Sequence, residues 1–292
     1  MSADESPADE SPEVLRYAAF AAAPDGGNPA GVVLDAAALD DADMLRIAAE
    51  VGYPETAFVL GGEVRDGVRR YPIRYWSPGA EVPFCGHATV ATAVVLAERD
   101  GAGEMVLDTS VGEVVLTATV TESGTAVAFT SVAPEVRDID AGALGRLLDL
   151  LGLALDDLDP AFPPREAFAG NWHPVVVLAD AELFHQFRFA PAPLSALMAE
   201  RGWTGTVTVL HPSAPGEYRA RNLFPVGRIT EDPATGSAAA STGAYLRAIG
   251  RALPDETIRI RQGEHVGRPS LLTVTIPATG GIVVSGGATR IR

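Results

Sequence analysis

A glutamate, a cysteine and a histidine are the side chains of this sequence most suited to moving a proton. Glu55 opens the apolar segment ETAFVL, where burial would raise its pKa and let it act as an acid and as a base near neutral pH. Cys85, the only cysteine of the chain, precedes Gly86 and His87 at the start of a run of small helix-forming residues. His87 is an acid or a base by residue type. Each also has an ordinary interpretation: a solvent-exposed strand end for Glu55, a small buried residue for Cys85, and a hydrogen-bonded helix start for His87.

Glu231 and Asp232 form a second acidic group, in a turn that precedes the segment PATGSAAAS. Either carboxylate is suited to cap the following helix or to act as an electrostatic partner in a site. The residue types alone do not decide between these two roles.

The segments CGHAT and ATGSA both place a glycine where a helix of small residues is expected to begin. The first turn of a helix has backbone N–H groups without intrahelical partners, and the helix dipole adds positive charge there. A glycine at that point lets a ligand approach the backbone closely. Two such helix starts facing each other would bind a carboxylate or a forming enolate. The alternative is that the Gly and Ser residues only begin and cap helices.

The two helix starts belong to a weak internal repeat, which relates residues 74–96 to residues 221–246. Each stretch reads as a strand, a Pro turn, an acidic residue, a glycine and a helix of small residues. After a three-residue insertion, the matched pairs are Arg74 with Arg221, Pro78 with Pro225, Glu81 with Glu231, Gly86 with Gly236, Ala88 with Ala238, and Leu96 with Leu246. The repeat predicts two similar halves, whose buried helices start near each other at the cleft between them.

Hydrophobic periodicity predicts the elements that must position these residues. Strands are expected at 14–20, 55–60 and 68–76, three more over 103–130, and a pair in the C-terminal tail. Helices are expected at 40–51, 87–98 and 141–153, and from about residue 237. The 87–98 helix has little polar surface, so we expect it to be buried on all sides. The Pro-rich stretch 159–174 is expected to be a connector.

Composition excludes several classes of protein. The net charge of −16 disfavours binding to nucleic acid or to anionic membranes. All 22 basic residues are arginine, which excludes Schiff-base chemistry on an internal lysine and a Walker-type phosphate loop. One cysteine forms no intramolecular disulfide and no cysteine-based zinc site. No apolar run approaches the roughly 20 residues that span a bilayer, and we expect a cytoplasmic protein with a disordered acidic leader over residues 1–13.

Five segments together resemble the PhzF family, the phenazine-biosynthesis isomerases and their relatives. They are GNPAGVVL, PETAFVL, RYWSPGAEVPFCGHATVATAVVL, TEDPATGSAAASTGAYL and RQGEHVGRPSLLTVTI. The resemblance runs from about residue 14 onward and implies an α+β, diaminopimelate epimerase-like fold. In that fold two pseudo-symmetric halves each wrap a curved β-sheet around a central helix. The implied halves are residues 14–130, joined by a C-terminal strand at 280–292, and residues 131–279.

The resemblance also implies a role for each site residue. Glu55 matches the general acid/base that takes a proton from one carbon of a dihydro-hydroxyanthranilate and returns it to another. His87 matches a histidine lining the site, and Asp232 an aspartate on the opposite half. The positions that match substrate-binding positions are Gly86, Gly236 and Ser237, together with Asn28 and Thr235. No metal or cofactor is implied, the substrate is a small carboxylate, and the assembly is a homodimer.

The related racemases and epimerases use two cysteines, one on each face of the substrate. Cys85 occupies the position of the first, but the matching segment DPATGS has no cysteine, so the count excludes a two-thiol mechanism. Two alternatives to the isomerase remain. One is an epimerase with a single thiol, in which Cys85 faces Glu55 or Asp232 and a helix start lowers the thiol pKa. The other is a non-enzymatic binding protein that retains the fold. The resemblance does not identify the substrate.

Overall fold

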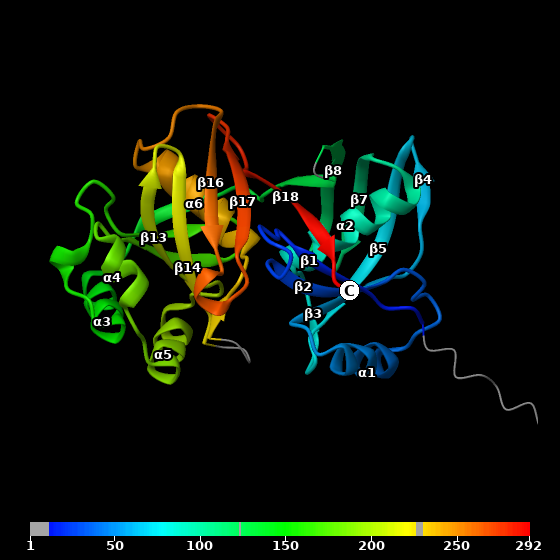
Figure 1. Ribbon diagram of the computed structural model, residues 1–292, viewed down its shortest axis with the longest axis horizontal. Helices are drawn as coiled ribbons and strands as arrows, with labels where there is room; N and C mark the ends of the chain where they lie inside the picture. The colour runs from blue at the N-terminus through cyan, green and yellow to red at the C-terminus, as the bar shows by residue number, and fades with distance from the viewer. Residues whose placement is uncertain (1–11, 123, 226–229) are drawn as a thin grey trace, which may run out of the picture.

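The computed structural model describes residues 12–122, 124–225 and 230–292, and it forms two lobes that lie side by side (Figure 1). Most of the acidic leader expected over residues 1–13 lies outside the described residues. The N-terminal lobe contains β1 (Leu15–Ala19), β2 (Asn28–Val33), α1 (Asp41–Val51), β3 (Glu55–Val59), β4 (Glu63–Arg65), β5 (Val68–Trp76), β6 (Glu81–Val82), α2 (Gly86–Asp100), β7 (Gly103–Thr109), β8 (Gly112–Thr121) and β9 (Gly124–Thr130).

The C-terminal lobe follows in the chain and has its own strands and helices. It contains β10 (Glu135–Asp138), α3 (Ala141–Leu151), β11 (Arg165–Phe168), β12 (Trp172–Val177), α4 (Ala181–Gln186), α5 (Pro191–Arg201), β13 (Val207–Ala214), β14 (Glu217–Leu223), β15 (Glu231–Asp232), α6 (Gly236–Ala248), β16 (Glu256–Gln262) and β17 (Ser270–Ile276), with short 3₁₀ turns at Leu155–Asp157 and Glu264–Val266. The last strand is β18 (Val283–Arg290).

Each lobe wraps its sheet around one buried helix. In the N-terminal lobe α2 is buried from residue 87 to residue 97 and contacts β1, β2, β3, β8, β9 and β18. In the C-terminal lobe α6 is buried over most of its length and contacts β10, β11, β12, β17 and β18. Both helices consist mainly of Ala, Val, Thr, Ser and Gly, whose small side chains let strands approach from several sides. This α+β architecture confirms the expected fold class, and the expected burial of the 87–98 helix is also confirmed.

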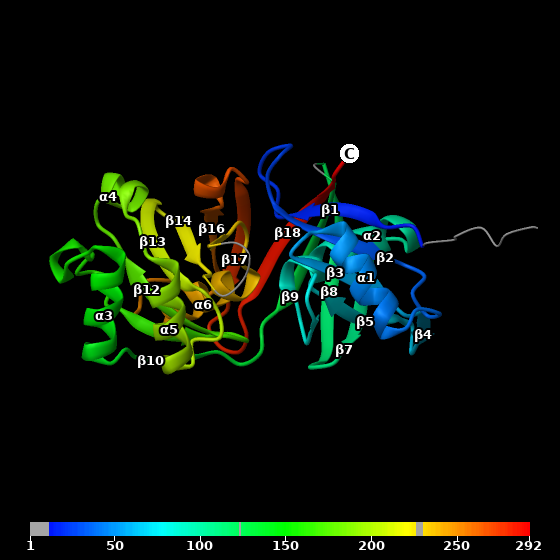
Figure 2. The same ribbon diagram turned by 90° about the horizontal axis from the view of Figure 1, so that it is seen from below.

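The remaining helices lie on the outside of the sheets (Figure 2). The α1 helix packs on β3 and β5, while α3 and α5 pack together over the C-terminal lobe. Their starts are fixed by side chains: Asp40 accepts a hydrogen bond from the N–H of Asp43, and Asp140 accepts one from the N–H of Ala143. None of the helices in the described ranges is both long and apolar enough to cross a membrane.

The β18 strand links the two lobes. It pairs with β17 in the C-terminal lobe, where Val284 lies opposite Val274, and with β9 in the N-terminal lobe, where Val284 lies opposite Phe129. Its last residues pair with β1, where Arg290 lies opposite Tyr17. The strand crosses from one lobe to the other in both views (Figures 1 and 2). The two lobes are therefore joined by main-chain hydrogen bonds as well as by a linker.

The internal repeat of the sequence has a physical counterpart in two equivalent ion pairs. Arg74 of β5 binds Glu81 of β6, with 2.7 Å between Nε and Oε1, and Arg221 of β14 binds Glu231 of β15, with 2.9 Å between Nη2 and Oε2. In both lobes the glutamate lies opposite the residue two positions after its arginine. The first pair is partly exposed, whereas both side chains of the second are 5% exposed. The same strand–turn–helix unit is thus built twice, with its ion pair buried only in the C-terminal lobe.

The expectation of a connector over residues 159–174 is wrong for its second half. Residues 165–168 form β11, which pairs antiparallel with β10 and with the start of β12. Glu166 is buried there because Arg137 and the indole N–H of Trp203 bind its carboxylate. Pro174 is tolerated because pairing of β12 with β13 begins only at Val175, so the missing N–H falls outside that ladder.

Candidate active site

The starts of α2 and α6 meet between the lobes, and Asn28 connects them. Asn28 is fully buried at the beginning of β2. Its amide nitrogen lies 3.1 Å from Nδ1 of His87, 2.8 Å from Oδ1 of Asp232 and 3.0 Å from the carbonyl oxygen of Ala234. One side chain of the N-terminal lobe thereby contacts both helix starts, and the structure brings together Asn28, His87 and Asp232, three residues that the family resemblance assigns to the site.

Glu55, Cys85 and His87 form a compact cluster on the N-terminal side of this junction. Nε2 of His87 lies 3.2 Å from Oε2 of Glu55, and the Cys85 thiol donates to the same oxygen with 3.4 Å between Sγ and Oε2. Sγ also lies 3.4 Å from Nδ1 of His87. The Glu55 side chain is 22% exposed, whereas that of His87 is 9% exposed. The carboxylate therefore stands at the accessible edge of an otherwise buried group.

Burial keeps the histidine and the thiol of this cluster in their neutral forms. It lowers the pKa of His87, and the nearby Glu55 charge acts against that shift. It raises the pKa of the Cys85 thiol well above its ordinary value, and the Glu55 charge adds to the effect. The neutral thiol donates its hydrogen to Glu55 and is not a ready nucleophile or base. Glu55 thus accepts a hydrogen bond from a neutral thiol and lies beside a neutral imidazole, and neither neighbour carries positive charge.

The same three residues have a spacing that could hold a metal ion, because their ligand atoms all lie within 4.8 Å of one another. Thiols bind metals as thiolates, however, and the raised pKa of Cys85 opposes that form. The arrangement therefore suits proton transfer better than metal binding.

Asp232 lies on the opposite side of the junction and is held by three side chains. Oδ2 accepts a hydrogen bond from the Thr235 hydroxyl at 2.5 Å, and Oδ1 accepts one from the Asn28 amide. The Gln262 amide donates to the carbonyl oxygen of Asp232 and to the Thr235 hydroxyl. Burial raises the pKa of Asp232 to about 7, aided by the Glu55 charge and opposed by the two hydrogen bonds. The capping role considered for Asp232 is not what the structure shows, because Thr235 is the N-cap residue of α6.

Neither helix start at the site is capped by its own N-cap side chain. Cys85 precedes α2 and Thr235 precedes α6, and neither makes the side-chain hydrogen bond seen at α1 and α3. A Cβ on Gly86 would meet one atom within 4 Å, a ring carbon of Phe84 at 3.9 Å. Apart from the N–H of Ala88, which interacts with the Cys85 sulfur, the first-turn N–H groups are thus not occupied by the N-cap side chains, and such groups attract anions.

Two of the acidic and polar residues that the sequence singles out, Glu231 and Ser237, make their side-chain contacts with residues other than Glu55, His87 and Asp232. Glu231 is buried in its ion pair with Arg221. Ser237 lies in the first turn of α6, where its hydroxyl oxygen is 3.1 Å from Nε2 of His173. Sequence reasoning missed His173 because it fell in the assumed connector, and it also missed Gln262. A single sequence carries no signal for either, since both reach the site only through strand pairing.

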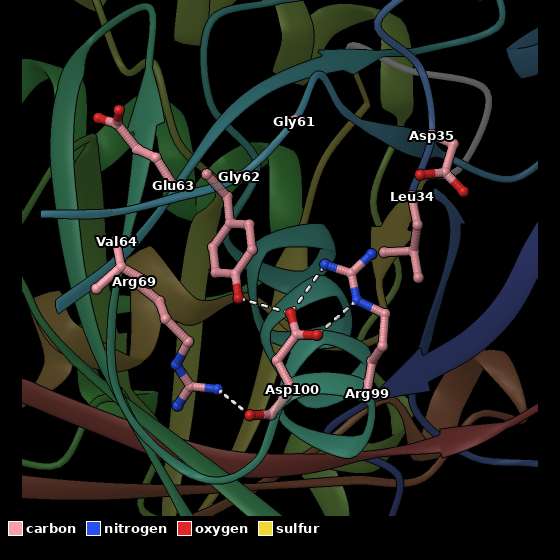
Figure 3. Close-up of a pocket in the computed structure, with 10 residues that line it drawn as sticks. Leu34, Asp35, Gly61, Gly62, Glu63, Val64, Arg69, Arg99 and Asp100 are labelled. Atoms are coloured by element: carbon pink, nitrogen blue, oxygen red, sulfur yellow. Dashed lines mark hydrogen bonds and ion pairs between the residues drawn. The ribbon is translucent and has the colours of Figure 1, made fainter. Parts of the chain in front are cut away.

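The pocket drawn in Figure 3 lies at the other end of α2 and is not part of this site. Its volume is about 380 Å³, and its lining includes Tyr71, Arg99 and Asp100. The Tyr71 hydroxyl and the Arg99 guanidinium both bind the Asp100 carboxylate, while Arg69 donates to the carbonyl oxygens of residues 100, 101 and 102. These contacts supply hydrogen-bond donors to the carbonyl oxygens at the C-terminal end of α2. The predicted site residues gather at the start of the same helix.

Comparison with known proteins supports the expected relationship over nearly the whole chain. The family model described as phenazine biosynthesis-like protein matches residues 17–291. An uncharacterized isomerase of Deinococcus radiodurans is 35% identical, with 91% of this chain and 88% of the relative covered. Trans-2,3-dihydro-3-hydroxyanthranilate isomerase of Pseudomonas fluorescens is 31% identical, with 87% and 86% covered.

A solved structure agrees with the sequence comparison. The PhzF-family phenazine biosynthesis protein of Bacillus anthracis superimposes with a TM-score of 0.83 at 27% identity, over 96% of each chain. The match includes both lobes and the strand that joins them. This chain therefore belongs to the PhzF family of phenazine biosynthesis-like proteins, and it is an isomerase.

Proposed function

We propose that this isomerase works without a cofactor and moves a proton between two carbons of a small carboxylate-bearing substrate, shifting a double bond. Glu55 would take the proton and then return it. The observation that carries the proposal is the setting of the Glu55 carboxylate: one oxygen accepts from the Cys85 thiol and lies 3.2 Å from Nε2 of neutral His87, and the group stays partly exposed. A positioned carboxylate of this kind can act first as a base and then as an acid on one bound substrate.

The histidine supports this role by lying beside the carboxylate without supplying a charge. Because burial keeps His87 neutral, its contact with Glu55, 3.2 Å between Nε2 and Oε2, is not a full ion pair. A charged imidazolium would stabilise the carboxylate more strongly and make it a weaker base. The Asn28 amide nitrogen lies 3.1 Å from Nδ1 of His87 and the imidazole also forms a hydrogen bond with the backbone of Pro29, so these contacts hold the ring beside Glu55.

The substrate carboxylate belongs at the two helix starts. Glu55 and Asp232 repel an anion, whereas the uncapped first turns of α2 and α6 attract one. Asn28 adds an acceptor to the site, because its Oδ1 is buried and has no hydrogen-bond partner among the described residues. A substrate with a hydroxyl or amino group beside its carboxylate would satisfy that oxygen.

The name of the P. fluorescens relative supplies the first substrate to test, trans-2,3-dihydro-3-hydroxyanthranilate. It carries a carboxylate, a hydroxyl and an amino group, which are the groups that the helix starts and Asn28 would bind. The relatives also include uncharacterized isomerases, so other small carboxylates with a mobile double bond belong in the same screen.

Solvent exchange in deuterated water tests the assignment of the base. We expect wild-type protein to convert the dihydro compound with deuterium entering the product, and Glu55→Gln to lose at least about a hundredfold in rate, the range for losing a general acid/base. Cys85→Ser is the matched comparison, because a serine hydroxyl still donates to Glu55, and we expect it to keep most of the activity. Retained exchange in Glu55→Gln together with loss in Cys85→Ser would instead support the single-thiol epimerase. Absence of turnover and exchange in wild-type protein would reject this substrate.

A further inference from the structure

His173 is a fully buried histidine that reaches the first turn of α6 from β12. Its Nε2 lies 3.1 Å from the Ser237 hydroxyl oxygen, and its Nδ1 faces the backbone of Thr206 at 3.0 Å. Burial lowers the pKa of His173 to about 4, so the ring is neutral at ordinary pH. A neutral imidazole has one N–H, and its position decides whether the ring donates to Ser237 or accepts from it.

The fold makes a specific space for this ring. A Cβ placed on Gly205 would lie 2.2 Å from Cε1 and 2.5 Å from Nε2 of His173, closer than real contacts allow. Gly205 is itself anchored, because its N–H donates to the carbonyl oxygen of Trp172 at 3.0 Å. The ring therefore occupies a slot that no larger residue at 205 would leave open, and its direction toward Ser237 is set by the backbone.

The surroundings of Nδ1 decide which nitrogen carries the hydrogen. Nδ1 lies 3.0 Å from both the buried backbone nitrogen and the carbonyl oxygen of Thr206. A hydrogen on Nδ1 would bind that carbonyl but leave the N–H without this acceptor, whereas a bare Nδ1 accepts from the N–H and leaves the carbonyl without this donor. The Thr206 hydroxyl donates its hydrogen to Oδ1 of Asn222 at 2.7 Å, so it has none to give to Nδ1, 3.1 Å away. A buried N–H without a partner is rarer and costlier than a carbonyl with an unused lone pair. Nδ1 is therefore the acceptor, and Nε2–H donates to Ser237.

We propose that His173 is a positioning residue, which fixes the Ser237 hydroxyl as a donor toward the substrate carboxylate at the start of α6. A hydroxyl has one hydrogen and can accept as well as donate. When Ser237 accepts from Nε2–H, its own hydrogen is free for the ligand. Ser237 is partly exposed whereas His173 is not, so the serine is the member of the pair that a ligand can reach. The proposal rests on the proposed function for the identity of the ligand group, but the hydrogen-bond direction within the pair does not.

A double-mutant cycle with a matched pair of substitutions tests the role in binding. The glutamine amide of His173→Gln can place an N–H near the former Nε2, whereas the shorter asparagine of His173→Asn reaches only as far as Nδ1. With the dihydro compound, we expect KM to rise about tenfold in Ser237→Ala, the loss of one hydrogen bond to a charged group, with kcat less affected. We expect a similar rise in KM in His173→Asn, and a rise of less than about threefold in His173→Gln. Adding His173→Asn to Ser237→Ala should change KM little further, because both substitutions remove the same hydrogen bond.

Additive effects in the double variant, or equal losses in the glutamine and asparagine variants, would overturn the positioning role. Should His173→Asn fail to fold, Gly205→Ala offers a second route, because it displaces the ring while keeping both hydrogen-bonding groups. It is expected to raise KM in the wild-type background but not in Ser237→Ala.

A spectroscopic measurement separates this inference from the proposed function. In protein labelled with ¹⁵N-histidine, the protonated and bare nitrogens of a neutral ring differ in chemical shift. The His173 signals are identified by their loss in His173→Gln. We expect hydrogen on Nε2 and a shift of that signal in Ser237→Ala, whether or not the dihydro compound is turned over. Hydrogen on Nδ1 would overturn the inference even if the isomerase assignment holds, and absence of turnover with hydrogen on Nε2 would reject only the substrate.

Discussion

Asp232 is the residue of the site whose charge changes near neutral pH. Its folded-state pKa of about 7 lies above the ordinary value near 4 for an aspartate. Between those two pH values the folded protein binds a proton that the unfolded chain releases. The free energy of unfolding therefore falls as the pH rises from about 4 to 7, which is the opposite of the usual behaviour of a salt-bridged carboxylate.

Asp232→Asn should remove this dependence. An asparagine keeps the shape of the side chain and an oxygen for one of its two donors, but it has no charge to bury. We expect the wild-type protein to lose stability relative to the variant between pH 4 and pH 7, by at most about 4 kcal/mol for three pKa units. Urea denaturation of both proteins at a series of pH values measures the difference. Parallel pH profiles for the two proteins would contradict the raised pKa.

Among elements, α6 shows how closely a helix of small residues approaches its sheet. A Cβ on Gly243 would lie 2.8 Å from a methyl carbon of Ile282 and 3.0 Å from one of Val274. Gly243→Ala should therefore destabilise the protein by about 1 to 3 kcal/mol, because the packed side chains must shift. Gly145→Ala in the middle of α3 is the matched control, since a Cβ there meets nothing within 4 Å. The control should gain about 0.5 to 1 kcal/mol from helix propensity. Chemical denaturation of the two variants gives the signs, and equal effects would refute this account of the packing.

The helices were the elements most accessible from sequence, because their signals are local. The expected helices at 40–51, 87–98 and 141–153 correspond to α1, α2 and α3, and the one from about residue 237 corresponds to α6. Periodicity and small-residue composition sufficed for these. The stretch 165–168 is not recognisable as a strand from its local sequence, because its strand character depends on pairing with β10 and β12 and on partners that bury Glu166.

The candidate site could likewise be predicted from the sequence only in part. Glu55, His87 and Asp232 were predicted from residue type and family resemblance, and the structure brings them to one junction through Asn28. His173 was not, since its route to Ser237 depends on the position of β12 beside α6 and on the absence of a side chain at Gly205. Contacts that join residues distant in sequence are the part that spacing cannot supply.

At the scale of the whole molecule, Phe20 marks the point where the two lobes meet. It is buried, and its backbone donates to Gly287 of β18 and accepts from the N–H of Leu271 of β17. Its φ of 61° lies in the left-handed region, which a phenylalanine rarely adopts without support from its surroundings. A Cβ on Gly286 would lie 2.4 Å from Cδ1 of the Phe20 ring. The junction thus depends on a large ring that packs directly against a glycine.

Gly286→Ala should disturb the packing of the Phe20 ring at the contact between the lobes. We expect a loss of about 1 to 3 kcal/mol in the free energy of unfolding, because the Phe20 ring must move. The double variant Phe20→Leu/Gly286→Ala should recover part of the loss, since a leucine leaves space for the added methyl group. Denaturation midpoints of the two single variants and the double variant test the coupling. Strictly additive losses would show that the ring and the methyl group do not compete for space.

The path of β18 has a consequence for how a cell makes this protein. The strand covers part of α2 and completes the sheet of the N-terminal lobe beside β1 and β9. Until residues 283–290 have emerged from the ribosome, both of those strands lack a neighbour and expose an edge that can pair with other chains. The first lobe therefore cannot finish folding during most of translation, although its other strands are made early. A nascent chain of this design needs protection from aggregation until the second lobe and its closing strand have been synthesised.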